Sequence, residues 1–218
     1  MAYSVGMVAL QGPNWFFGID SIFELIGTIV LFMIFFASYK AYKLTAMKRY
    51  KYYSYAFLAL MMGHLARTIA NFAIHQHWLP LNELKEVFIY GYGAHILFTL
   101  SALVLLVAFT FEVKEKKSFC VLLLLMLAMI FVSSSFYLAF YWAAMVMFGF
   151  VTWHLVRNAR TKRIITPKLV ALSFALLAFT QLLFLGTALL PELYLGAQIM
   201  QLLGFLILFI AMVKVQAR

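Results

Sequence analysis

Long apolar stretches recur along the whole chain and are separated by short polar joints. Each of the seven stretches is near the roughly 20 residues that a helix needs to cross a bilayer. They lie near residues 20-39, 53-75, 86-111, 118-134, 137-157, 168-189 and 193-213. A soluble domain would instead alternate apolar and polar positions with the period of a half-buried helix or strand. The pattern predicts an all-α membrane protein that crosses the bilayer seven times as a single domain, residues 1-218.

Basic residues gather in alternate joints. Apart from Lys85 and Arg67, they lie in the first, third and fifth joints and in the C-terminal tail, at Lys40, Lys43, Lys48, Arg49, Lys51, Lys114, Lys116, Lys117, Arg157, Arg160, Lys162, Arg163, Lys168, Lys214 and Arg218. Cytoplasmic loops carry an excess of Lys and Arg. We therefore predict a multi-pass protein of the cell membrane, with the N-terminus outside and the C-terminus in the cytoplasm. The basic joints alternate only if all seven spans are counted. The pattern therefore favours two separate spans on either side of Ser133, Ser134 and Ser135 over one long kinked helix.

Composition narrows the class of protein further. With 66% hydrophobic and 11% charged residues, the chain has too little polar surface to cover a soluble globule. The net charge of +10 is explained by the joints, so a nucleic-acid partner is not expected. The basic joints, which have several tyrosines nearby, are instead expected to contact anionic lipid head groups. A single cysteine, Cys120, excludes disulfides within the chain and zinc sites built on cysteine.

The two halves of the chain share matched polar positions. In the third and seventh spans, the segment Gly93-Ala94-His95-Ile96 aligns with Gly196-Ala197-Gln198-Ile199, so His95 corresponds to Gln198. In the second and sixth spans, Ala56-Phe57-Leu58 aligns with Ser173-Phe174-Ala175, so His64 corresponds to Gln181. This predicts a 3+1+3 parallel internal repeat of two triplets in the same orientation. The repeats would be residues 19-111 and 137-213, with a linker helix at 118-134.

Polar side chains also lie inside the predicted spans. His64, Arg67 and Asn71 are spaced to share one face of the second span, as are Tyr92, His95 and Thr99 on the third. A charge near the bilayer centre costs several kcal/mol unless it is paired or hydrated, so Arg67 should face the bundle interior with Glu24 as its partner. We predict a polar pocket in the outer half of the membrane, open outward, made by Glu24, His64, Arg67, Asn71, Tyr92, His95, Gln181, Gln198 and Gln201.

Three functions are compatible with such a pocket. The first is a sensor of a small ligand or ion, or an accessory subunit of a membrane complex; because the joints are short and no output domain is expected, a partner membrane or cytoplasmic protein would be required. The second is an electron-transfer subunit in which His64 and His95 are the axial ligands of a haem b. The third is a purely structural subunit, whose polar groups only hold the helices together.

Other chemistries are disfavoured by what the spans contain. An alternating-access carrier is not expected because Pro13, Pro80, Pro167 and Pro191 all lie at or outside span ends. A retinal protein would need a lysine in the middle of the last span, where Lys214 is instead at the end. No intramembrane Ser-His pair, Asp pair or H-E-x-x-H motif is present. The sequence therefore favours a protein that is not an enzyme.

Overall fold

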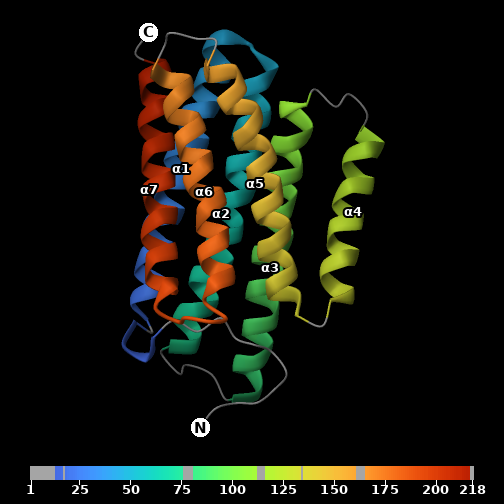
Figure 1. Ribbon diagram of the computed structural model, residues 1–218, viewed down its shortest axis with the longest axis vertical. Helices are drawn as coiled ribbons and strands as arrows, with labels where there is room; N and C mark the ends of the chain where they lie inside the picture. The colour runs from blue at the N-terminus through green and yellow to red at the C-terminus, as the bar shows by residue number, and fades with distance from the viewer. Residues whose placement is uncertain are drawn as a thin grey trace.

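The chain is a bundle of helices that run side by side (Figure 1). The computed structural model describes residues 13–16, 18–75, 81–111, 116–133, 135–160 and 165–216. Within these ranges a short 3-10 turn, η1 (Asn14–Phe16), precedes α1 (Ile19–Thr45), α2 (Lys48–His75), α3 (Leu81–Thr110), α4 (Lys116–Val132), α5 (Phe136–Arg160), α6 (Ile165–Gly186) and α7 (Leu193–Gln216). The all-α prediction is confirmed.

The fourth helix differs from the others in length. The other six are each long and apolar enough to cross a membrane, whereas α4 has 17 residues and is about 25 Å long at 1.5 Å per residue. The hydrocarbon core is about 30 Å thick. The predicted separation of two helices at the serines is confirmed, since α4 ends at Val132 and α5 starts at Phe136 as its antiparallel neighbour (Figure 1). That α4 crosses the bilayer stays a prediction.

Several helices extend beyond the apolar stretches that predicted them. The first joint, predicted over 40-51, is almost wholly helical, because α1 continues to Thr45 and α2 starts at Lys48. Lys, Arg and Tyr are compatible with helices, and their long side chains reach water from the last turn. The reversal needs only Ala46 in the left-handed conformation, with φ 53° and its N–H donating to the Tyr42 carbonyl oxygen. Hydropathy predicts the part of a helix that lies in lipid, but it does not predict the polar helical turns that continue into water.

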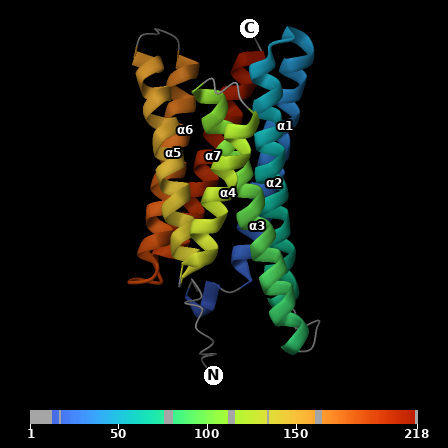
Figure 2. The ribbon, with the colours of Figure 1, turned by 90° about the vertical axis from the view of Figure 1, so that its right-hand side faces the viewer.

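The helices form two triplets. In the first, α2 packs against α1 and α3; in the second, α6 packs against α5 and α7. The triplets meet where α1 contacts α7 and where α3 contacts α5, and α4 lies outside against α3 and α5 (Figure 2). If α1 is matched with α5, α2 with α6 and α3 with α7, the contact of α1 with α7 corresponds to the contact of α5 with α3. The two contacts between the triplets are then equivalent. A parallel repeat would produce that pattern, and the repeat itself stays a prediction.

The two ends of the bundle interior differ in chemistry. Towards the basic joints, the interior is an apolar cluster that includes Leu31, Ile34, Phe57, Leu103, Phe174 and Leu208, all of them buried. Towards the opposite end, where α1 and α7 begin, buried charged and amide side chains lie beside a second apolar cluster that includes Phe16, Phe140 and Phe184. Among the described residues, the buried charges, amides and histidines are therefore confined to one half of the bundle, and packed hydrocarbon closes the other.

The predicted direction across the membrane can be tested with single cysteines. The described basic residues of alternate joints share the end of the bundle where α1 ends and α2 begins; Lys114, Lys162, Arg163 and Arg218 lie outside the described residues. In a Cys120→Ser background, Glu192→Cys should react with a membrane-impermeant maleimide in intact cells. Lys43→Cys should react only after permeabilisation, since the positive end faces the cytoplasm. Labelling in the reverse order would contradict the predicted orientation.

Candidate functional site

A buried ion pair lies at the centre of the polar half. The Nε of Arg67 is 2.7 Å from Oε1 of Glu24. The two residues are only 3% and 2% exposed, respectively. Glu24 is in the second turn of α1, and Arg67 lies two turns before the end of the antiparallel α2, so the two side chains meet at the same depth. The predicted partner of Arg67 is confirmed.

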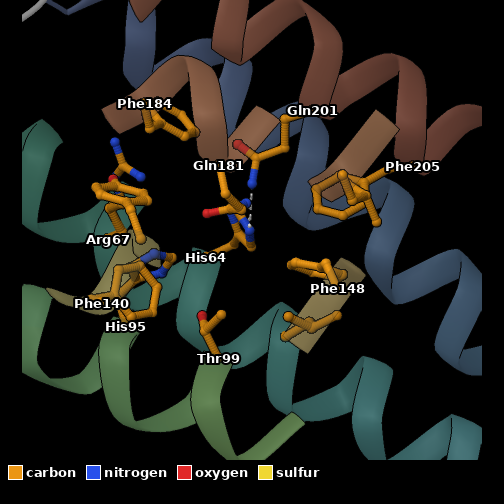
Figure 3. A pocket seen from close by; sticks show the side chains of 13 residues that line it. His64, Arg67, His95, Thr99, Phe140, Phe148, Gln181, Phe184, Gln201 and Phe205 are labelled. Atoms are coloured by element: carbon orange, nitrogen blue, oxygen red, sulfur yellow. Dashed lines mark hydrogen bonds between the residues drawn. The ribbon is translucent and has the colours of Figure 1, made fainter. Parts of the chain in front are cut away.

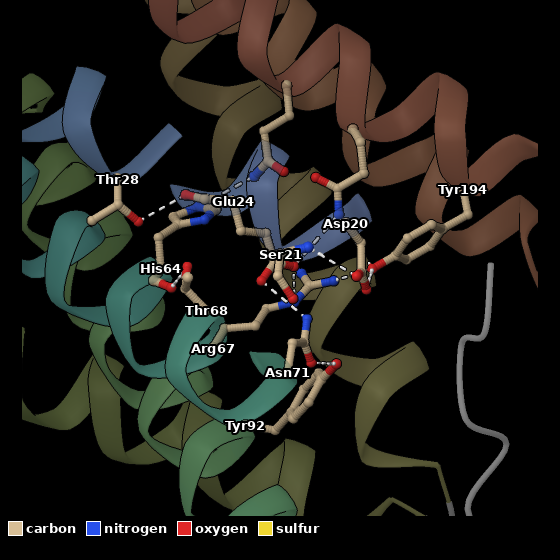
Figure 4. A network of polar contacts seen from close by, with 12 residues as sticks. Asp20, Ser21, Glu24, Thr28, His64, Arg67, Thr68, Asn71, Tyr92 and Tyr194 are labelled. Carbon is tan, nitrogen blue, oxygen red and sulfur yellow. Dashed lines mark hydrogen bonds and ion pairs between the residues drawn. The ribbon is translucent and has the colours of Figure 1, made fainter. Parts of the chain in front are cut away.

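A second side chain of α2 and one of α7 complete the bonding of the carboxylate. Asn71 donates its Nδ2 to Oε2 of Glu24 at 3.0 Å and accepts at Oδ1 from the Tyr92 hydroxyl at 2.9 Å (Figure 4). Gln198 of α7 lies with its Nε2 at 3.5 Å from Oε1 of Glu24. Glu24 thereby joins α1 to α2 and α7, and through Asn71 to α3. These hydrogen bonds offset part of the cost of burying the charge.

The guanidinium of Arg67 is held on its other side by aromatic residues. Its Nη2 donates to the Tyr194 hydroxyl at 2.9 Å, and its Cζ lies 5.5 Å from the centre of the Tyr92 ring and 5.7 Å from that of Phe184. Cations are attracted to the faces of aromatic rings at such distances. Arg67 is therefore fixed between the carboxylate and three rings, with little freedom to turn away.

The network reaches the end of the bundle at Asp20. The Tyr194 hydroxyl is 3.4 Å from Oδ2 of Asp20, which is only half-buried. The other oxygen of Asp20 accepts from the backbone N–H groups of Gly18 and Ser21, which anchors this carboxylate at the start of α1. The contacts therefore form a continuous path from the bundle end to the buried pair. Asp20 was not among the predicted pocket residues, although its spacing of four residues from Glu24 was a signal.

Deeper in the bundle, two histidines and two glutamines line a small cavity (Figure 3). Nε2 of His64 is 3.3 Å from Nε2 of Gln201, and the His64 and His95 rings meet edge to face at 5.3 Å between centres. Thr99, Gln181, Tyr141 and the charged Arg67 complete the polar lining. The volume open to the centre of a water-sized sphere is about 10 Å³, which is room for one water molecule.

A second cavity of the same size lies beside the first. It is lined by Glu24 and Gln198 and shares His64, Gln201 and Phe205 with the inner cavity. Two water-sized spaces therefore adjoin the His64–Gln201 contact, one next to the carboxylate and one next to His95. We call them the outer and the inner cavity.

The structure brings all nine predicted pocket residues together in one half of the bundle. Five of them form the ion-pair network and four surround the inner cavity. Their arrangement differs from the predicted open pocket, because the side chains bond to one another and leave only water-sized spaces at these positions. Charged and amide side chains bond to one another across the bundle because leaving such a group without a partner inside the membrane raises the free energy of the folded state.

The haem hypothesis does not fit these distances. A porphyrin between His64 and His95 would have to separate rings that now touch, in a cavity with room for one water. Phe140 packs against His95 and Phe205 against His64, which closes the flanks. Among the described residues, no cluster of three or more His, Cys, Asp or Glu side chains is placed to hold a metal ion. The space between the histidines is the size of a water molecule.

Comparison with known proteins does not add to this picture. No protein-family model, no curated protein and no solved structure matches the chain. A function must therefore be argued from the geometry and chemistry of the site itself. What the fold shows is a multi-pass membrane protein: a bundle of apolar helices in contact with the lipid bilayer.

Proposed function

We propose that the chain is a membrane-embedded ion sensor, or an ion-responsive accessory subunit of a membrane complex, in which the Glu24–Arg67 pair is the responsive element. The observation that carries this proposal is the continuous set of polar contacts from half-buried Asp20 through Tyr194 to the buried pair. A buried ion pair is not needed to stabilise the bundle, because well-packed apolar residues of similar volume often stabilise a fold at least as much. A buried charge in a membrane span therefore indicates a functional site.

The position of the pair supports a role in transmitting a change. It joins α1 and α2 of the first triplet to α7 of the second, through Tyr194 and Gln198. Weakening it would loosen one of the two seams between the triplets. A shift of α7 against α1 would move the helix ends at the opposite face, where Lys43 and Lys214 lie in the last turns. We infer that a partner protein reads this movement at the basic end.

The size of the cavities favours an ion over an organic ligand. The two spaces beside the pair each admit one water molecule, so a larger ligand would have to part the helices. The apolar cluster beyond the inner cavity favours a sensor over a pore, because Leu60, Phe148 and Leu177 close the interior there. A site that polar contacts connect to only one end of the bundle can bind and release an ion without conducting it.

Thermal unfolding in nanodiscs tests the proposal. The melting temperature should shift with pH or with one ion of a panel of chlorides, because a ligand at a hundred times its Kd stabilises the folded state by about 2.7 kcal/mol. Glu24→Gln should abolish that shift. Ser173→Ala is the matched control: its hydroxyl is also buried and binds the Gly204 carbonyl oxygen between α6 and α7, outside the site. A melting temperature that ignores pH and every ion would overturn the proposal.

The competing function is a purely structural subunit. The observation in its favour is that the carboxylate and the guanidinium bond to each other and to side chains of the bundle. This alternative predicts no response of the melting temperature to the identity of the added ion, and a pH dependence no larger than the linkage of one buried carboxylate. Packing alone does not account for the buried Nδ1 atoms of His64 and His95, which have no hydrogen-bond partner among the described residues.

A further inference from the structure

Three buried polar atoms at the inner cavity have no hydrogen-bond partner among the described residues. They are Nδ1 of His64, Nδ1 of His95 and Oγ1 of Thr99, on side chains no more than 5% exposed. All three residues line the inner cavity. Buried polar atoms in proteins are nearly always bonded to protein or to ordered water. A cavity of this size, lined by several such atoms, has the polarity and the room that one water molecule requires.

The outer cavity offers a matching place on the other side of His64. Glu24, Gln198, His64 and Gln201 supply its polar lining. A water molecule here would lie between a carboxylate and an imidazole. The order along the bundle is then Asp20, Tyr194, the ion pair, a water, His64, a water, and finally His95 with Thr99.

We propose that the ion taken by this site is the proton, and that His64, with one water molecule in each cavity, carries it between Glu24 and His95. The inference rests on the proposed function, because it names the ion of the same site. An imidazole is suited to the task, since one ring nitrogen accepts a proton while the other donates one.

The transfer balances without any other reactant. A proton from external water binds a carboxylate oxygen of Glu24, which weakens the ion pair while Arg67 keeps its charge. The outer water accepts this proton and gives one of its own to the facing nitrogen of His64. The opposite nitrogen releases its proton to the inner water, and that water protonates His95. Because the apolar cluster closes the bundle beyond this point, the proton returns by the same route.

The surroundings of Glu24 favour a proton over a metal cation. The charged and titratable groups that face the pair are Asp20 on α1, Arg67 on α2, Tyr92 on α3, Tyr141 on α5 and Tyr194 on α7, and α6 contributes Gln181 and Phe184. A metal cation would have to displace Arg67 from the carboxylate and collect several oxygen ligands in a water-sized space. A proton needs no coordination shell and no volume.

Exchange of the His95 ring N–H with D2O tests the route. We would label histidine with nitrogen-15, follow each ring by solid-state NMR in nanodiscs, and compare wild type with His64→Gln. Glutamine keeps an amide near Gln201 but cannot relay a proton, so exchange at His95 should slow by roughly a hundredfold, the order that a positioned proton-transfer group contributes. His154→Gln, at the far end of α5, should leave the His95 rate unchanged.

Two outcomes separate the inference from the proposed function. A protein that still responds to pH through Glu24, but exchanges His95 equally fast in His64→Gln, would overturn the relay and keep the sensor. Should His64→Gln fail to fold, cryo-electron microscopy of the wild type decides the same point. Density for one water in each cavity supports the relay, whereas two empty cavities would contradict it.

Discussion

Replacing Arg67 by leucine is expected to lower the free energy of unfolding by about 3–5 kcal/mol, the usual cost of removing one partner of a buried ion pair. The variant would leave the Glu24 carboxylate inside the bundle without its cation and Tyr194 without the donor at 2.9 Å. Such a loss is comparable with the whole stability of many domains. Unfolding in mixed micelles, followed by circular dichroism, would measure it.

Two further variants separate the charge from the packing. Adding Glu24→Gln to Arg67→Leu should recover part of the loss, because a neutral amide still bonds to Asn71 and no charge is left buried. Arg157→Leu, an exposed arginine near the end of α5, serves as the control and should change stability by no more than about 0.5 kcal/mol. If the double variant were less stable than Arg67→Leu alone, the cost would come from lost packing and not from an unpaired charge.

The ion pair was predictable from sequence because few charged residues lie within the predicted spans. Arg67 is the only basic residue deep within a predicted span, and Glu24 was the one obvious acid at the matching depth. The helical spacing of His64, Arg67 and Asn71 then fixed which face of α2 turns inward. Few charges and a strong penalty for exposing them to lipid make such a contact one of the safest inferences in a membrane protein.

Other features of the site depend on geometry that spacing does not contain. Tyr194 is both apolar and polar, so its place between Arg67 and Asp20 depends on how α7 is rotated against α1. The size of the two cavities depends on how far Phe140 and Phe205 intrude among the histidines. An open pocket and a closed network have the same sequence pattern. The difference between them decides which ligands are small enough to enter.

The close approach of α2 and α3 leads to the second large effect, at Gly91. A Cβ built at Gly91 would collide with the Cβ of Ala70 and lie 3.3 Å from the carbonyl oxygen of Ala66. Small residues let membrane helices approach in this way. Gly91→Leu must therefore push the two helices apart, at a cost of about 1–3 kcal/mol or more. Because Tyr92 is the next residue, the same shift should break its hydrogen bond to Asn71.

Gly93 on the same helix provides the matched control. A Cβ built there meets nothing within 4 Å, and replacing a helical glycine improves helix propensity by up to about 1 kcal/mol. Gly93→Leu should therefore leave the melting temperature unchanged or raise it, while Gly91→Leu lowers it and removes the response to pH that depends on the network. Equal melting temperatures for the two variants would show that α2 and α3 are not in close contact at Gly91. The link between helix packing and the polar site would then be lost.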